Sequence, residues 1–229
     1  MRIAAWSGPR NLSTAMMYAF GNRPDFDAMD EPFYAHWLAE TGVQHPMRED
    51  ILRSQPTDAA KVADLMRRDG DPHVYQKHMA HHLTSNTPLG WAEGCVHIHL
   101  IRHPARVIAS YGAKHDDLSE DLIGFAAQAT LHDRLGGIVV DTEALRCEPH
   151  AMLKTLCATI GLPWDESMLK WPRGPKSFDG VWASHWYGSA HESTGFAGPE
   201  GPLPDVKRGD LLASALPFYE AMKARALRP

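Results

Sequence analysis

A cationic turn follows the first apolar run of the chain and has the residue types that bind a multi-oxygen anion. Its residues are Gly8, Pro9, Arg10, Asn11, Leu12, Ser13 and Thr14. The guanidinium of Arg10 presents a fork of donors and keeps its charge, which suits phosphate or sulfate oxygens. If a helix begins at Ser13, its backbone N–H groups and its dipole also favour an anion there. The turn therefore predicts an anion site, although Ser13 or Thr14 could instead serve only as a helix N-cap.

A second cationic segment begins at Arg102, directly after another apolar run. Pro104 predicts the first turn of a helix, where a missing N–H costs nothing. Ser110 then lies about two turns into that helix, on the side that faces back toward Arg102. The pair could bind a second phosphate. It could also be an arginine that caps a strand and a serine that packs in a helix.

Alternating strands and helices must position these two segments. Apolar runs predict strands over residues 2–6, 25–29, 73–77, 96–101 and 138–141. Helical patterns cover 13–20, 35–69 with breaks near Pro46 and Pro56, the segment after Pro104, 119–135, 149–160 and 210–225. This order predicts an α/β fold of three layers, α/β/α, in which helices cover both faces of a mainly parallel sheet. Ligands of such sheets bind beyond the carboxyl ends of the strands, where both cationic segments lie.

The composition is that of a globular chain, and we expect one domain over residues 1–229. The chain has 229 residues, of which 44% are hydrophobic and 22% are charged. Residues 172–206 are rich in glycine, proline and aromatic residues, including Trp186 and Tyr187. This segment is too long for an ordinary connection, so it predicts a long loop or a lid that covers the site.

Charge and segment patterns argue against several kinds of partner. The formal net charge of −5 disfavours nucleic acid, which attracts basic proteins. No window has the roughly 18 apolar residues of a membrane span, and the N-terminus shows no signal-peptide pattern. We therefore expect a cytoplasmic protein. The fourteen histidines and three cysteines show no familiar metal-ligand spacing, so we expect no metal.

The first turn resembles the 5′-phosphosulfate loop of sulfotransferases that use 3′-phosphoadenosine-5′-phosphosulfate (PAPS). That loop typically reads Pro-Lys-Ser-Gly-Thr-Thr, and residues 9–14 occupy the same frame. Arg10 replaces the usual lysine and keeps its charge, while Leu12 replaces the usual glycine. The turn is also close to a nucleotide P-loop, but it lacks the lysine that follows the second glycine of that motif.

The second segment resembles the part of the same family that binds the 3′-phosphate of the donor. An arginine, a proline and a serine recur at this spacing, so the family's binding residues correspond to Arg102 and Ser110. A third match lies at 141–163, and the resemblance spans roughly residues 1–165. It implies a sulfotransferase fold like that of P-loop nucleoside triphosphate hydrolases. Lys207 and Arg208, followed by glycine, resemble the family's Arg-Lys-Gly end-piece, which helps to bind the 3′-phosphate.

Sulfuryl transfer needs a base that takes a proton from the acceptor, and two residues are candidates. Glu31 follows the second predicted strand, where several bacterial and polysaccharide sulfotransferases have a catalytic glutamate. His78 opens residues 78–83, which we expect to be a loop or a short helix, and resembles the catalytic histidine of cytosolic sulfotransferases. We favour Glu31, because the residues around His78 match that pattern imperfectly. Lys77 could stabilise the bridging oxygen, and Arg10 is the favoured stabiliser of the leaving phosphate.

Together these features predict a PAPS-dependent sulfotransferase that acts on a hydroxyl or an amine of a small acceptor. PAPS would be the co-substrate, 3′,5′-adenosine bisphosphate the product, and no metal would be needed. An ATP-dependent kinase of the P-loop type is one alternative, although the missing Gly-Lys-Ser/Thr argues against it. A nucleotide-binding protein without catalysis is another. The sequence leaves open the identity of the acceptor and whether the chain forms a homodimer.

Overall fold

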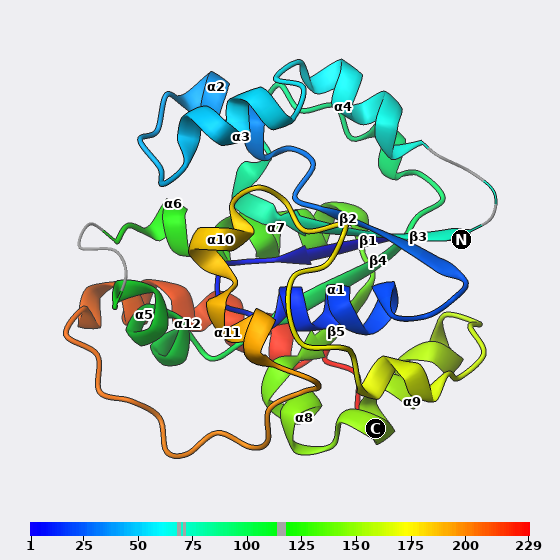
Figure 1. Cartoon of the computed structure of the whole chain (residues 1–229). Helices are drawn as coiled ribbons and strands as arrows, with labels where there is room; N and C mark the ends of the chain where they lie inside the picture. Colours follow the sequence, from blue (N-terminus) through cyan, green and yellow to red (C-terminus); the bar gives the residue numbers. More distant parts are fainter. Residues whose placement is uncertain (68–69, 71, 114–117) are drawn as a thin grey trace.

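A parallel β-sheet forms the centre of the molecule (Figure 1). The computed structural model describes residues 1–67, 70, 72–113 and 118–229. Within these ranges the sheet has five strands in the order β2-β3-β1-β4-β5, and every pairing is parallel. The strands are β1 (Arg2–Ser7), β2 (Phe26–Asp30), β3 (His73–Met79), β4 (Val96–Ile101) and β5 (Ile138–Asp141). The predicted parallel sheet is confirmed, and β3 continues two residues beyond its expected end at residue 77.

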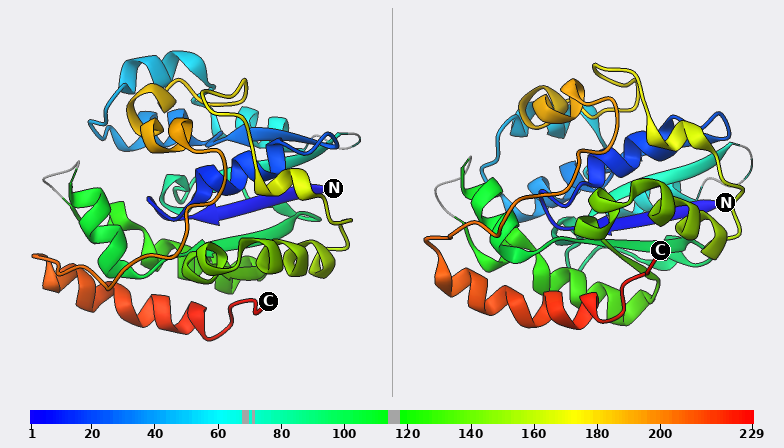
Figure 2. Two further views of the ribbon diagram at one scale, coloured as in Figure 1. Left: turned by 60° about the horizontal axis from the view of Figure 1, so that its bottom comes forward. Right: turned by 90° about the horizontal axis from the view of Figure 1, so that it is seen from below.

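Helices cover both faces of this sheet (Figure 2). They are α1 (Ser13–Gly21), α2 (Tyr34–Thr41), α3 (Arg48–Ser54), α4 (Ala59–Met66), α5 (Pro104–Gly112), α6 (Glu120–Ile123), α7 (Phe125–Leu135), α8 (Thr142–Cys147), α9 (Pro149–Thr159), α10 (Ala183–Trp186), α11 (Gly188–Glu192) and α12 (Gly209–Lys223). Short 3₁₀ turns are η1 (Ala80–His82), η2 (Gly90–Ala92) and η3 (Glu166–Leu169). The predicted breaks near Pro46 and Pro56 separate α2, α3 and α4, and residues 68–69 of that helical prediction lie outside the described residues.

The alternation of side chains along β1 explains the three layers. Successive residues of a strand point to opposite faces of a sheet. Ile3 and Ala5 pack with α1 and α9 in one core, whereas Ala4 and Trp6 pack with α4 and α7 in another. A further cluster joins α5 and α12 to the ends of β4 and β5. The three-layer α/β/α architecture is therefore confirmed.

Two predicted elements differ from the structure. The helix expected over 119–135 is divided into α6 and α7 by Gly124, whose φ of 71° lies in the left-handed region. The long segment 172–206 contains α10 and α11, and Figure 1 shows α11 beside the first turn of α1. Local aromatic and glycine content indicated a covering segment but did not reveal these short helices.

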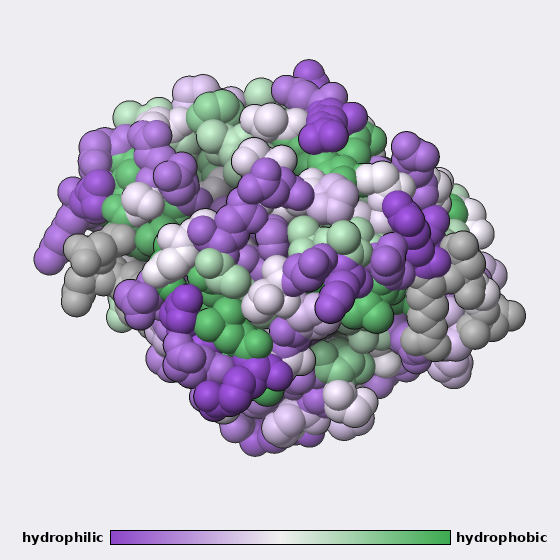
Figure 3. Space-filling view, turned by 90° about the horizontal axis from the view of Figure 1, so that it is seen from above, coloured by the Kyte–Doolittle hydropathy of each residue, from purple (hydrophilic) through white to green (hydrophobic). Residues whose placement is uncertain are grey.

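Polar and apolar residues are mixed on the face of the molecule shown in Figure 3. The large apolar side chains that are exposed lie on separate elements, including Leu65 on α4 and Phe218 on α12. In the described part of the chain, no helix combines the length and the apolar character needed to cross a membrane.

Candidate active site

A cavity of about 330 Å³ lies at the carboxyl ends of the central strands. Residues 9–15 line it after β1, Glu31 after β2, His82 after β3 and Arg102 after β4. Side chains from 186–197 border it on the remaining side. The parallel sheet therefore brings both cationic segments and the favoured acid–base residue to one cavity.

The turn after β1 is fixed by contacts with distant elements. The backbone N–H of Gly8 donates to Gln128 Oε1 at 3.0 Å, and Asn11 Nδ2 donates to Leu100 O at 3.2 Å. A Cβ atom at Gly8 would lie 2.9 Å from the carbonyl oxygen of Ile123, so a side chain does not fit there. Gly8 is not among the described residues that line the cavity. It positions the turn through its contacts with Gln128 and Ile123.

The turn leads into α1 without a side-chain hydrogen bond from its N-cap residue to the first turn of the helix. Arg10 and Leu12 have φ angles of 62° and 56°, in the left-handed region where glycine is usual. Helix α1 begins at Ser13, so Ser13 and Thr14 lie in its first turn rather than at the N-cap. The N-cap residue is Leu12, which makes no side-chain cap hydrogen bond. The first N–H groups of a helix have no partner within it, and the residues that carry them here, Ser13, Thr14 and Ala15, line the cavity.

Arg10 joins the first cationic segment to the second. Its Nε donates to Ser110 Oγ at 3.0 Å, and Arg102 Nη1 donates to the carbonyl oxygen of Arg10 at 2.7 Å. Burial and, next, the nearby charge of Arg102 lower the pKa of Arg10. Because the charge of Arg102 acts on the guanidinium of Arg10, the two positive groups are near enough to attract the same anion.

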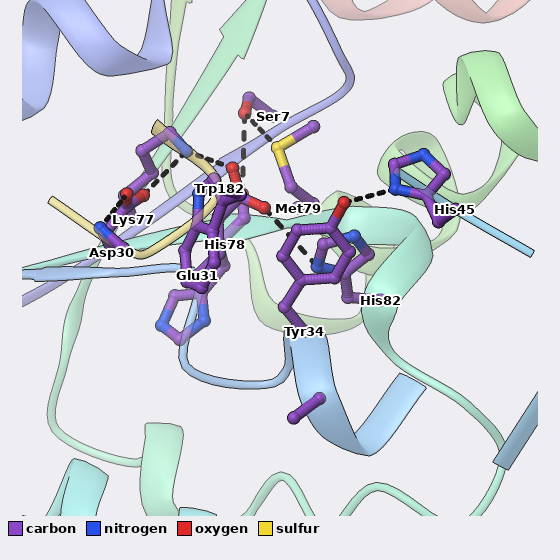
Figure 4. Close-up of polar contacts among 12 residues, drawn as sticks. Ser7, Asp30, Glu31, Tyr34, His45, Lys77, His78, Met79, His82 and Trp182 are labelled. Carbon is purple, nitrogen blue, oxygen red and sulfur yellow. Dashed lines mark hydrogen bonds and ion pairs between the residues drawn. The ribbon is translucent and has the colours of Figure 1, made fainter. Parts of the chain in front are cut away.

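Asp30, Glu31, Lys77 and Tyr187 form a buried polar network at the other side of the cavity. Figure 4 shows Lys77 reaching toward both carboxylates. Lys77 Nζ donates to Asp30 Oδ1 at 2.9 Å, to Tyr187 OH at 2.8 Å and to Glu31 Oε1. The Tyr187 hydroxyl in turn lies 2.8 Å from both Asp30 oxygens and donates to that carboxylate. The long segment therefore completes the network, because Tyr187 lies on it.

This network holds two carboxylates against one ammonium group. Burial raises the pKa of Glu31, and Lys77 offsets this only in part. Burial lowers the pKa of Lys77, but the two carboxylates outweigh it and the pKa is raised overall. His82, whose Nδ1 lies 3.8 Å from Glu31 Oε2, has a pKa well below its usual range because it is buried. Glu31 is thus a carboxylate that can exchange a proton nearer to neutral pH than a free glutamate can.

The backbone of Glu31 is itself strained, with a φ of 39°. Its N–H donates to Lys77 O at 2.9 Å, and its carbonyl accepts a hydrogen bond from Gln55 Nε2 at 3.1 Å. A positive φ in a non-glycine residue persists only where surrounding contacts hold it, as these two hydrogen bonds do here.

His78 lies away from the cavity, so the structure does not support its prediction as an alternative base. Because β3 continues through Met79, His78 lies within the strand and points to the face opposite Lys77. Its ring stacks on Trp6 with centroids 4.6 Å apart and lies 5.0 Å from the ring of Trp91. Burial, with the charge of Lys77, lowers its pKa to about 3. His78 is therefore a neutral core residue and is not among the described residues that line the cavity.

Lys207 and Arg208 also lie away from the cavity, so the structure does not support their predicted contact with a phosphate. Arg208 Nη1 donates to Leu118 O at 2.9 Å, and its Nε lies 2.9 Å from Asp210 Oδ1. Neither Lys207 nor Arg208 is among the described lining residues. Arg208 instead pairs with Asp210 in the first turn of α12.

Several lining residues carried no recognisable sequence signal. Tyr34 stacks on His82 with centroids 4.4 Å apart, its hydroxyl bonds to His45 Nδ1, and His45 stacks on Trp186 at 5.5 Å. Arg146, on α8, also borders the cavity. The aromatic content of 172–206 indicated only the part that contains Trp186. The other residues meet through tertiary packing.

A resident metal ion has no evident ligand set in the described ranges, where no group of three or more histidine, cysteine, aspartate or glutamate side chains could hold one. Asp30 and Glu31 both pair with Lys77. An ammonium group thus takes the position beside the carboxylates that a divalent cation would need.

Comparison with known proteins identifies the family. Residues 1–226 match the family model described as a sulfotransferase domain. The chain belongs to this sulfotransferase family. Two solved sulfotransferase domains share its fold. The domain of the Synechococcus PCC 7002 olefin synthase has a TM-score of 0.58 and 19% identity, covering 95% of this chain and 94% of that one. The domain of the curacin biosynthetic pathway has a TM-score of 0.51 and 16% identity, covering 94% and 96%.

Two curated relatives from Arabidopsis thaliana are closer in sequence. Branched-chain-amino-acid aminotransferase-like protein 2 is 33% identical over 231 residues, which cover 96% of this chain and 41% of the relative. Branched-chain-amino-acid aminotransferase-like protein 1 is 34% identical over 232 residues, covering 97% and 41%. This sulfotransferase domain spans about two fifths of the length of these relatives. Its membership of the sulfotransferase family supports sulfuryl transfer in general.

Proposed function

We propose that this chain is a PAPS-dependent sulfotransferase, with Glu31 as the general base, that acts on a hydroxyl or an amine of a small acceptor. The observation that carries the proposal is that Arg10, Arg102 and Ser110 share one cavity with a carboxylate of raised pKa. The cavity volume of about 330 Å³ falls within the range of ligand pockets.

The resemblance to the family orients the donor in this cavity. The 5′-phosphosulfate would lie against residues 9–14, where Arg10 and the first N–H groups of α1 can donate to its oxygens. The 3′-phosphate would lie near Arg102 and Ser110. The hydrogen bond from Arg10 Nε to Ser110 Oγ supports this arrangement, because it joins a residue proposed for the 5′-phosphosulfate to one proposed for the 3′-phosphate.

The reaction then needs one proton transfer and one displacement at sulfur. Glu31 takes the proton of the acceptor hydroxyl or amine as the acceptor atom forms a bond to sulfur. The bond between sulfur and the bridging oxygen breaks, and its electron pair remains on the 5′-phosphate of the product. Arg10 and the start of α1 stabilise the negative charge that develops on this phosphate.

Lys77 takes a different role from the one expected for it. Its ammonium group has three protons, and the structure directs them to Asp30, Glu31 and Tyr187 rather than toward the turn after β1. We assign Lys77 to positioning Glu31 and keep Arg10 as the group that stabilises the leaving phosphate.

Transfer of radiolabelled sulfuryl groups from PAPS to a library of small alcohols, phenols and amines tests this proposal. The native protein should label at least one acceptor. Glu31→Gln should bind adenosine 3′,5′-bisphosphate as the native protein does and lose activity by about 10²–10⁴-fold, the usual contribution of a general base.

His78→Leu is the matched control for the base, because it removes the other candidate and puts an apolar side chain in its place in the core. This variant should lose stability and retain turnover per folded molecule. An active Glu31→Gln variant together with a folded but inactive His78→Leu variant would show that the base has been assigned to the wrong residue.

A further inference from the structure

Glu200, from the long segment before α12, inserts its carboxylate into a cluster of arginines beside the cavity. Arg102 Nε donates to Glu200 Oε2 at 3.2 Å, and Arg102 Nη2 donates to Oε1, so this pair is bidentate. Arg106 Nε lies 3.5 Å from Oε2, and Arg146 Nη1 lies 3.4 Å from Oε1. The side chain of Glu200 is only 11% exposed. One carboxylate therefore faces three guanidinium groups.

The same arginines hold the backbone on both sides of Glu200. Arg146 Nε donates to Gly198 O at 2.8 Å, and Arg106 Nη2 donates to Gly201 O at 2.6 Å. These carbonyl and carboxylate oxygens take up arginine donors of the kind that would otherwise bind an oxyanion. Segment 198–202 thus rests on a cationic surface.

The cluster keeps an excess of positive charge. Among the described residues, Glu143 is the other acidic group that pairs with this cluster: its Oε1 lies 3.9 Å from Arg106 Nη2, and its side chain is 42% exposed. Burial raises the pKa of Glu200, but Arg102, Arg146 and Arg106 together outweigh this and lower the pKa overall, so the carboxylate is charged at neutral pH. A phosphate group, with three oxygens and up to two charges, would satisfy three guanidinium groups better than a carboxylate does.

We infer that Arg106 and Arg146 join Arg102 and Ser110 in the site for the 3′-phosphate of the donor, and that Glu200 occupies this site in the free protein. The inference rests on the proposed function. Arg106 and Arg146 then supply the contacts that the sequence assigned to Lys207 and Arg208. The donor displaces the Glu200 carboxylate and releases segment 198–202 from the arginines, so this segment is a strap that competes with the donor.

Calorimetric titration of Glu200→Gln tests the competition. This variant should bind adenosine 3′,5′-bisphosphate about tenfold more tightly than the native protein, which corresponds to about 1.4 kcal/mol. Its affinity for adenosine 5′-monophosphate, which lacks the 3′-phosphate, should not change. Glu192→Gln is the control, because Glu192 also lies within 172–206 and its ion pair with Arg173 is exposed. Unchanged or weaker binding of the bisphosphate to Glu200→Gln would overturn the inference.

A measurement on the native protein covers the case in which Glu200→Gln does not fold. Hydrogen exchange of the amides in 195–201 should become faster when the bisphosphate binds, because the strap loses its hold on the arginines. Slower or unchanged exchange would mean that Glu200 stays in place and would overturn the inference.

Inorganic sulfate separates this inference from the proposed function. If the native protein bound neither nucleotide, the proposed function would fail, but sulfate should still raise the melting temperature of Glu200→Gln more than that of the native protein. Equal shifts in the two proteins would overturn the assignment of the arginine cluster as an anion site.

Discussion

Neighbouring residues of one strand have opposite surroundings in this protein. Lys77 points into the cavity and pairs with two carboxylates, whereas His78 points into the core and stacks on Trp6. The sequence indicated both residues as candidates for catalysis. The structure distinguishes them, because β3 runs through Met79 and neighbouring residues of a strand point to opposite faces of the sheet. Glu31 could be predicted from its position after β2, but its surroundings could not, because Tyr187 arrives from a segment more than a hundred residues away.

At the residue scale, the raised pKa of Glu31 predicts the acid limb of the pH profile. A base acts in its charged form, so kcat/KM should fall as the pH is lowered through a value above the ordinary glutamate pKa of about 4.3. The steady-state rate measured against pH gives this value, which belongs to the coupled network of Glu31 and Lys77. A profile that stays flat down to the ordinary pKa would contradict the role of Glu31, and the residual rate of Glu31→Gln should lack this limb.

At the element scale, the sequence predicts the strands and most helices, but it does not predict the contacts between segments that lie far apart in the chain. The strands and most helices follow from apolar runs, prolines and glycines, because these patterns act locally. The sequence does not predict the division at Gly124, because apolar residues continue on both sides of it. The sequence predicts segment 172–206 only as a loop or lid over the site. The contacts of its Tyr187 and Glu200 could not be predicted, because their partners come together only in the assembled sheet.

The turn before α1 carries a prediction at this scale. Leu12 adopts a left-handed conformation that costs a non-glycine residue about 1–2 kcal/mol, and the related family loops have glycine there. Leu12→Gly should therefore raise the free energy of unfolding by about 1 kcal/mol, measured by urea denaturation.

Leu65→Gly is the matched control, because Leu65 is exposed within α4. Glycine in a regular helix should lower the free energy of unfolding by about 1 kcal/mol. If both variants were destabilised to the same extent, strain at Leu12 would not be a property of the protein in solution.

At the scale of the whole molecule, a chain of net charge −5 concentrates positive charge at one edge of its sheet. Arg10, Arg102, Arg106 and Arg146 come from four different connections or helices and meet because parallel strands end at the same edge. The sequence predicted the first two from motifs. The other two escaped prediction because nothing in their local sequence marks them.

The measurement that tests the central claim most directly compares two nucleotides without requiring the acceptor. Thermal unfolding is followed while the protein is titrated with adenosine 3′,5′-bisphosphate or with ATP and Mg²⁺. At a hundred times its dissociation constant, the bisphosphate should add about 2.7 kcal/mol of stability and raise the melting temperature by about 5–10 °C. ATP with Mg²⁺ at the same concentration should have a much smaller effect. A larger shift with ATP and Mg²⁺ would contradict the assignment of PAPS as the donor.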